Sequence, residues 1–187
     1  MACNLKSALK DKTTCKLTMA GTGDRAFFFD KADLYGDDGI LPVPGEGGKY
    51  DASAFAALQG KLVAVDIKPD SGQVTSAKTA ETEANSQVGT FVVTDNIDNF
   101  NETAHALAFI DFGVIIPKVG GGYYIVMSPY KKTKIENNYD SGTTYDSDHG
   151  FTVTVTAAPV EYAVTTWTPE TSVDLLTWTI DFKDPEQ

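Results

Sequence analysis

The sequence predicts a mainly β protein, a single β-sandwich or half-barrel domain with one short α-helix and a long projecting hairpin. Threonine occurs 22 times, and phenylalanine, tyrosine and tryptophan together occur 20 times, among 187 residues. These residue types favour strands because their branched or flat side chains pack well on a pleated surface. In residues 151–156, apolar side chains alternate strictly with threonine, which is the period of a strand with one buried face.

The first part of the chain contains an arm, two strands and a loop. Residues 1–16 are polar and rich in lysine, and we expect an N-terminal arm or a first edge strand there. Arg25–Asp30 is short and aromatic, which indicates a strand. Residues 34–51 hold so many glycines and prolines that we expect a projecting loop without regular structure, of a length that usually serves binding or assembly. A buried strand is expected next, at 61–68.

A long hairpin is expected after this strand. Small and polar residues alternate over 73–84, with Thr75 and Ala77 on one face, and 89–96 is typical of the returning strand. Residues 85–88 would form the turn between them. Because one face of the hairpin is polar, we expect it to project from the body or to face water.

One helix is predicted in the middle of the chain. Phe100, Ala104 and Leu107 have the i, i+4, i+7 spacing of a buried helical stripe. Asn101 is a suitable N-cap, and the helix should end by Gly113.

The remaining strands follow from apolar runs and from alternation. Apolar runs at 114–119 and 123–127, joined by three glycines, predict a hairpin whose first strand carries Pro117 and therefore lies at an edge or bulge. Residues 131–150 are polar and lead into the strand at 151–156. A further strand is expected at 162–167. Alternation at Leu176, Trp178, Ile180 and Phe182 predicts a C-terminal strand extension within 168–187. We expect the whole chain, 1–187, to form one domain.

The charge balance excludes several classes of function. Fifteen Lys and Arg against 26 Asp and Glu give a formal charge of −11. Such a chain lacks the basic surplus with which proteins grip DNA, RNA or an anionic membrane. No apolar run approaches the length that spans a bilayer. The N-terminus lacks the apolar run of a secretory signal, so we expect synthesis in the cytoplasm.

The sequence offers no positive sign of a catalytic, cofactor-binding or metal site. His105 lies in the predicted helix and His149 in a polar loop, and no Gly-x-Ser-x-Gly motif accompanies them. Cys3 and Cys15 are the only cysteines; they could form one bridge, although two such thiols are more often free. Two cysteines and two histidines do not match the spacing of a zinc site. We therefore predict that the chain is not an enzyme and uses no cofactor.

Two weaker ligand signals are present. Asp146 and Asp148 followed by glycine resemble the first half of a calcium loop, but the glutamate that such a loop requires is absent, so a solvated acidic turn is the preferred interpretation. Five aromatic residues could form a platform for sugars: Trp167, Trp178, Tyr123, Tyr124 and Tyr130. Trp178 alternates with apolar residues, which favours a place in the core.

Both ends of the chain carry short motifs in a particular order. Residues 1–5 read Met-Ala-Cys-Asn-Leu, a Cys-Lys pair begins at Cys15, a glycine-containing turn lies at 21–23, and an aromatic strand covers 26–30. A Thr/Glu-rich hairpin, one helix and a glycine-joined hairpin then precede Ser-Gly at 141–142 and the threonine-rich strand. This order resembles tail tube-like virion proteins of phages that infect Bacteroidetes-type bacteria. The loop at 34–51 and the chain after residue 162 lie outside the resemblance.

The resemblance implies a non-enzymatic virion protein of a phage tail. Subunits of this kind form rings, commonly hexameric, that stack into a tube through loops and terminal arms, and DNA passes through the channel without specific binding. The implied partners are further copies of the chain and other tail or neck proteins, with no membrane involved. A neck or ring adaptor, the tube of a contractile machine and a capsid decoration protein are close alternatives. From another class, a carbohydrate- or surface-binding β-sandwich module remains the main alternative.

Overall fold

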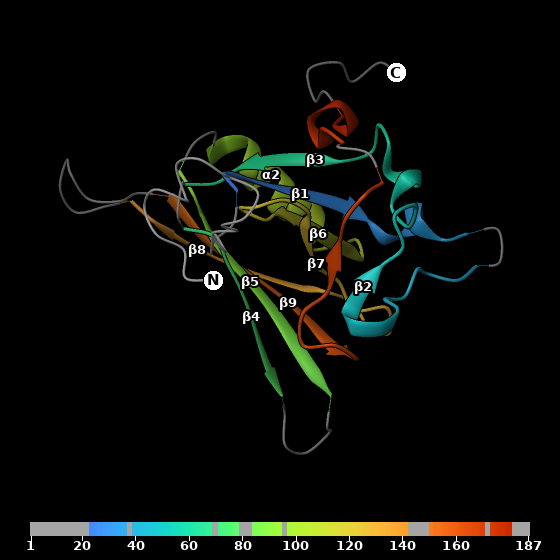
Figure 1. Ribbon diagram of the computed structural model, residues 1–187. Helices are drawn as coiled ribbons and strands as arrows, with labels where there is room; N and C mark the ends of the chain where they lie inside the picture. Colours follow the sequence, from blue (N-terminus) through green and yellow to red (C-terminus); the bar gives the residue numbers. More distant parts are fainter. Residues whose placement is uncertain are drawn as a thin grey trace, which may run out of the picture.

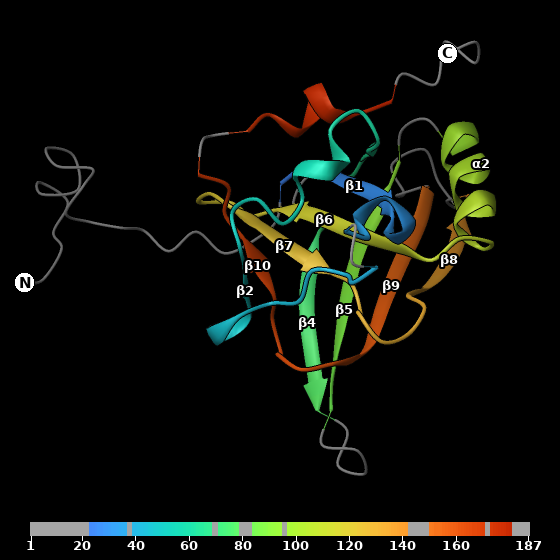
Figure 2. The same ribbon diagram turned by 90° about the vertical axis from the view of Figure 1, so that its right-hand side faces the viewer.

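Two β-sheets and one α-helix form the body of the protein (Figures 1 and 2). The computed structural model describes residues 23–36, 39–68, 71–78, 84–94, 97–141, 150–170 and 173–180. Within them the elements are β1 (Arg25–Asp30), β2 (Lys49–Tyr50), β3 (Val63–Asp66), β4 (Gln73–Lys78), β5 (Asn85–Val93), α2 (Ile97–Leu107), β6 (Phe112–Pro117), β7 (Tyr123–Val126), β8 (Lys134–Asp140), β9 (Gly150–Val160) and β10 (Thr166–Trp167). One sheet has the strand order β2-β10-β7-β6-β1-β3 and the other β4-β5-β9-β8. The predicted mainly β fold with one short helix is confirmed.

The two sheets pack face to face, and their strands cross at a steep angle (Figure 2). Phe28 of β1 contributes to the core between them, and its ring meets the ring of Phe91 on β5 edge to face, with centroids 6.1 Å apart. Val153 and Val155 of β9 are fully buried in the same core. The predicted inward face of this strand is therefore confirmed.

A second core covers the opposite face of the six-stranded sheet. Phe27 and Phe29 point there because successive strand residues alternate between faces, and both are buried. The covering residues come from the segments that precede β3 and that surround β10: Leu34, Leu41, Tyr50, Phe55, Leu58, Leu62, Trp167 and Leu175. All three phenylalanines of β1 are therefore buried, two in one core and one in the other.

The loop at 34–51 and the strand at 61–68 differ in part from expectation. The loop contains a 3-10 turn at Glu46–Gly48 and the short strand β2, and Leu41 and Tyr50 anchor it in the second core. Only part of it extends from the body (Figure 1). Strand β3 is the edge of its sheet and not a buried strand, since Ala64 is exposed while Val65 is buried.

The helix and its neighbouring hairpin also required correction. α2 begins at Ile97, so Asn101 lies inside the helix and not at its N-cap, whereas Phe100, Ala104 and Leu107 are buried as predicted. Residues 85–88 belong to β5 and do not form a turn. The β4–β5 hairpin extends beyond the six-stranded sheet, in agreement with a long projecting hairpin (Figure 1).

Two strand assignments were wrong for identifiable reasons. β6 is a central strand, between β7 and β1, and tolerates Pro117 because this residue is its last. The polar segment after residue 131 contains β8, which pairs with β9 from Lys134 to Asp140. Its side chains are mostly exposed, so neither apolar alternation nor burial identified it as a strand.

The predicted C-terminal strand extension at 168–187 is not formed in its described part. Leu175–Trp178 is a 3-10 turn, and only a single bridge joins Thr179 to Leu62. Asp174 begins the turn by accepting a hydrogen bond from the Leu176 amide at 3.1 Å. Only Trp167 and the residue before it form a strand in the expected segment 162–167. Residues 181–187 lie outside the described residues.

Replacing Val153 with aspartate should destabilise the protein by about 3–5 kcal/mol, because an unpaired charge would enter the core between the sheets. The matched control is Thr152→Asp, one residue away on the exposed face of the same strand, which should change stability by less than about 1 kcal/mol. Urea denaturation of both variants measures the difference. Equal losses would contradict the strand orientation.

The hydroxyl of Tyr50 is buried and has no hydrogen-bond partner among the described residues. Burial raises the pKa of Tyr50, so above about pH 10 the unfolded tyrosine releases its proton while the folded one keeps it. Stability that is present below pH 10 should therefore be lost as the pH rises further.

Tyr50→Phe should reduce this alkaline loss and leave stability at pH 7 unchanged or slightly higher. Tyr123→Phe is the comparison, because the Tyr123 hydroxyl donates a hydrogen bond to the Val173 carbonyl at 2.8 Å, and its removal should cost about 1 kcal/mol at pH 7. Denaturant titrations at pH 7 and pH 10.5, on the order of half a unit above the ordinary tyrosine pKa, check both statements. An alkaline loss that is the same in wild type and Tyr50→Phe would refute them.

Candidate functional site

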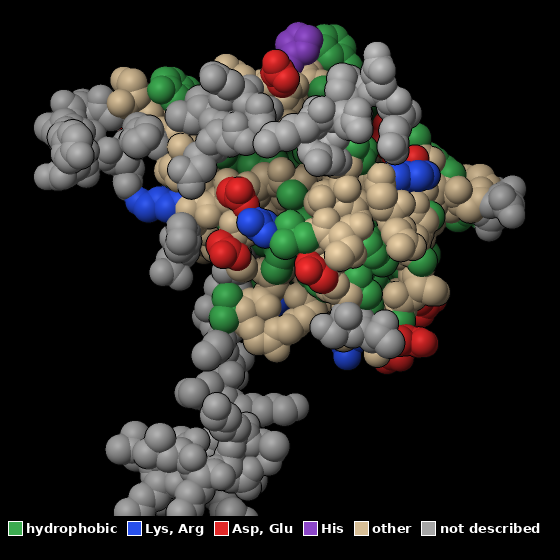
Figure 3. All heavy atoms as spheres, turned by 90° about the horizontal axis from the view of Figure 1, so that it is seen from above, with side chains coloured by type: hydrophobic (Ala, Val, Ile, Leu, Met, Phe, Trp, Pro, Cys, Tyr) green, Lys and Arg blue, Asp and Glu red, His purple; other side chains and the backbone are tan. Residues whose placement is uncertain are grey.

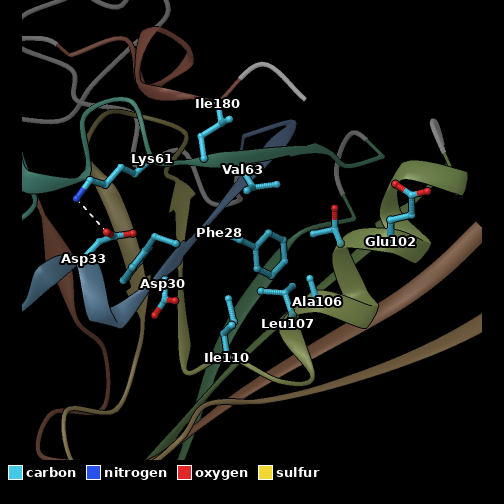
Figure 4. A pocket seen from close by; sticks show the side chains of 12 residues that line it. Phe28, Asp30, Asp33, Lys61, Val63, Glu102, Ala106, Leu107, Ile110 and Ile180 are labelled. Atoms are coloured by element: carbon cyan, nitrogen blue, oxygen red, sulfur yellow. Dashed lines mark hydrogen bonds and ion pairs between the residues drawn. The ribbon is translucent and has the colours of Figure 1, made fainter. Parts of the chain in front are cut away.

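A cavity of about 620 Å³ lies between α2, the strands β1 and β3, and the C-terminal segment (Figure 4). Its apolar wall is formed by Phe28 and Val63 of the sheet and by Leu107 and Ile110 at the end of α2, with Ile180 opposite. The cavity exists because β3 is an edge strand. No described strand continues the sheet past β3, and α2 packs beside it against the core between the two sheets.

The rim of this cavity is mainly acidic. Lys61 and Asp33 form an ion pair of 2.9 Å at one end, and Glu102 of α2 lies at the other (Figure 4). Asp30 also lines the cavity, and its carboxylate accepts the Ala32 amide at 2.8 Å at the start of a 3-10 turn. The lining thus carries three carboxylates and one ammonium, which favours an apolar group that bears positive charge.

The ionisable groups of the lining are three carboxylates and one lysine. The lining contains no histidine, cysteine or serine, and its one lysine is engaged by a carboxylate. A volume of this size is typical of sites that hold a small molecule or a few side chains. The cavity is therefore suited to binding.

A second candidate surface is the face of the four-stranded sheet that points away from the core. Pairing places the following residues on it: Gln73, Thr75 and Ala77 of β4; Ser86, Val88, Thr90 and Val92 of β5; Thr152, Thr154 and Thr156 of β9; Lys134, Glu136 and Asn138 of β8. None of these is buried. We call this set the threonine face.

The threonine face is polar but nearly uncharged along its centre. β5 and β9 contribute only serine, threonine and valine to it, and Lys134 and Glu136 lie on the outer strand β8. Hydroxyl groups keep such a surface hydrated, and the centre of the face has no Lys or Arg side chains that could bind phosphates. On the opposite side of the molecule, around β3, charges of both signs are interspersed (Figure 3).

The four-stranded sheet also has two open edges within the described residues. β4 pairs with β5 alone, and β8 pairs with β9 alone. Edge strands present backbone N–H and C=O groups to which a strand of another chain can pair.

The residues considered for catalysis and metal binding are not brought together in the part of the chain that the structure describes. His105 is exposed in the last turn of α2, with its ring 5.2 Å from that of Phe109. Cys3, Cys15 and His149 lie outside the described residues, as do both aspartates of the calcium-like segment, Asp146 and Asp148. The described residues contain no group of three or more metal-binding side chains.

The aromatic residues do not form an exposed platform. Trp167 is buried and donates a hydrogen bond from its indole N–H to the Ala52 carbonyl at 3.0 Å. Tyr123 and Trp178 pack around it, with ring centroids at 5.2 and 6.2 Å. Partial burial raises the pKa of Tyr123, and the nearby Asp174 charge adds to this. Of the five aromatic residues, Tyr130 is the most exposed.

Comparison of the chain with protein-family models, with curated proteins and with solved structures finds no match. No described helix is long and apolar enough to cross a membrane. The cavity beside α2 was not predicted, since its wall comes from residues far apart in the sequence, such as Phe28, Val63 and Leu107. The polarity of the threonine face was visible in the alternation of 151–156.

Two lysines with aspartate partners should differ greatly in their effect on stability. Lys31 is 1% exposed, pairs with Asp111 at 2.8 Å, and donates to the carbonyls of Ser128 and Lys131 at 2.7 and 2.9 Å. Lys31→Met should cost about 2–5 kcal/mol, because it leaves the carbonyls of Ser128 and Lys131 without the buried ammonium to which they are hydrogen-bonded. Lys61→Met, at the cavity rim, should cost less than about 1 kcal/mol, since its pair is partly exposed. Urea midpoints measure both; similar losses would contradict this account.

Proposed function

We propose that this chain is a non-enzymatic virion structural protein, a phage tail tube subunit that forms stacked hexameric rings around a channel for DNA. The observation that carries the proposal is the threonine face on a sheet with two open edges. The resemblance of the motif order to tail tube-like proteins supports it from the sequence.

Pairing of sheet edges between subunits would build the ring. If β4 of one subunit pairs with β8 of the next, each open edge is satisfied and the four-stranded sheets join into a closed barrel. Cyclic closure uses the same pair of surfaces in every contact, as a head-to-tail interface requires.

The threonine face suits the inside of such a barrel. Its central strands carry hydroxyl and small apolar groups and no Lys or Arg, so DNA phosphates would find no counter-charges to hold them. The chain's net charge of −11 acts in the same direction, because it repels a polyanion.

The loop at 34–51 offers a contact between stacked rings. Its described residues expose three large apolar side chains, Tyr35, Ile40 and Val43, although its base is anchored in the second core. Exposed apolar groups on a well-anchored loop are typical of assembly surfaces.

Proline substitutions in β4 test edge pairing. The backbone N–H groups of a strand point alternately to its two sides. One of the variants Thr75→Pro and Ser76→Pro therefore removes a hydrogen bond to β5, whereas the other removes only an N–H group that points outward from the sheet edge. The variant that keeps the wild-type urea midpoint should fail to form rings in electron micrographs. Glu136→Pro and Asn137→Pro form the corresponding pair on β8.

Wild-type protein, run beside the variants, is the control for assembly. Rings formed equally well by stable proline variants of both edges would contradict edge pairing. Loss of rings in the stable variants alone would support it.

A further inference from the structure

We propose that the cavity beside α2 receives the N-terminal segment, residues 1–22, of a second copy of the chain. The proposal rests on the self-assembly proposed above, because the donor is another subunit. It adds to that function a specific receptor site and its ligand.

The receptor is apolar in the middle and acidic at the rim. Phe28, Val63 and Leu107 supply apolar wall, while Asp30 and Glu102 supply carboxylates (Figure 4). The only lysine in the lining is already paired with Asp33, so the site lacks positive charge to balance the other two carboxylates. A partner that inserts apolar side chains and brings cations would match it.

The N-terminal segment has this composition, in contrast to the rest of the chain. Residues 1–22 contain four lysines and one aspartate, a charge of +3, and the remaining residues carry −14. Leu5 and Leu9 are each followed directly by a lysine. The C-terminal residues 181–187 are a poor match, because they contain three acidic residues and one lysine and would be repelled.

The attachment point of the segment allows a neighbour to be the donor. The cavity is lined by the last residues of β1, Phe28 to Asp30, whereas the segment joins the body at Gly23, whose amide donates to the Pro117 carbonyl at 2.7 Å. Strand β1 separates these two points by about 20 Å. An extended chain of this length reaches up to about 70 Å, which is enough to span to the cavity of a neighbouring subunit as well as to its own. The self-assembly proposed above makes the neighbour the donor, and isotope labels distinguish the two cases.

Photo-crosslinking in the full chain tests the proposal. A benzoyl-phenylalanine replaces Ala106, an exposed residue that lines the cavity, and protein labelled with nitrogen-15 is mixed with unlabelled protein before assembly. Mass spectrometry should identify crosslinks from position 106 of one copy to residues 1–22 of the other isotope. The same probe at Ala56, exposed on a 3-10 turn elsewhere, should give no such crosslink.

A charge exchange tests specificity. Glu102→Lys should lower the crosslink yield about threefold to tenfold, and Lys6→Glu with Lys10→Glu in the same chain should restore it. Crosslinks confined to one copy or to other segments, or a charge exchange without rescue, would overturn the proposal. Rings in the same sample would then leave the proposed function standing, whereas monomers without crosslinks between copies would overturn both.

Discussion

Burial of both faces of β1 is the constraint on which the rest of the structure depends. Phe28 fills the core between the sheets, and Phe27 and Phe29 need a cover on the other side. The chain supplies this cover from the 34–62 region and the segment around β10, so that the six-stranded sheet is enclosed on two faces. The packing is close enough that a side chain at Gly113, opposite Phe29, would overlap its ring.

The six-stranded sheet is covered on both faces, whereas the four-stranded sheet is exposed on one face. The four-stranded sheet has no second cover in the described residues. Its outward positions are all polar on β8 and β9, and they mix polar residues with alanine or valine on β4 and β5. A polar sheet face does not require a cover, whereas each open edge can pair with a strand of another chain. The self-assembly proposed above would pair both edges, and it links the packing of β1 to the proposed ring.

Three polar side chains with little or no exposure bind the backbone of neighbouring segments. Gln87 of β5 donates to the Tyr162 carbonyl at 3.0 Å, and Thr165 donates to the Ile125 carbonyl at 2.6 Å. Together with Lys31, these side chains hold in place the chain segments that connect the strands. Such groups are costly to leave unpaired, so they favour one arrangement of the layers over alternatives.

Elements with a strong local pattern could be predicted from the sequence. The strand around Val153 alternates without exception, β1 has three adjacent phenylalanines, and the spacing of Phe100, Ala104 and Leu107 is helical. β8 could not be predicted in this way, because its exposed side chains show no apolar alternation. Leu176 to Ile180 alternate as a strand would, although Leu176 lies in a 3-10 turn. The cavity depends on tertiary packing, and no local pattern of residues encodes it.

Negative-stain electron microscopy of the purified 20.1 kDa protein over a concentration series, with light scattering of the same samples, tests the central claim most directly. We expect rings or tubes with a central hole and a scattering mass that rises with concentration. A stable monomer at every concentration would contradict it.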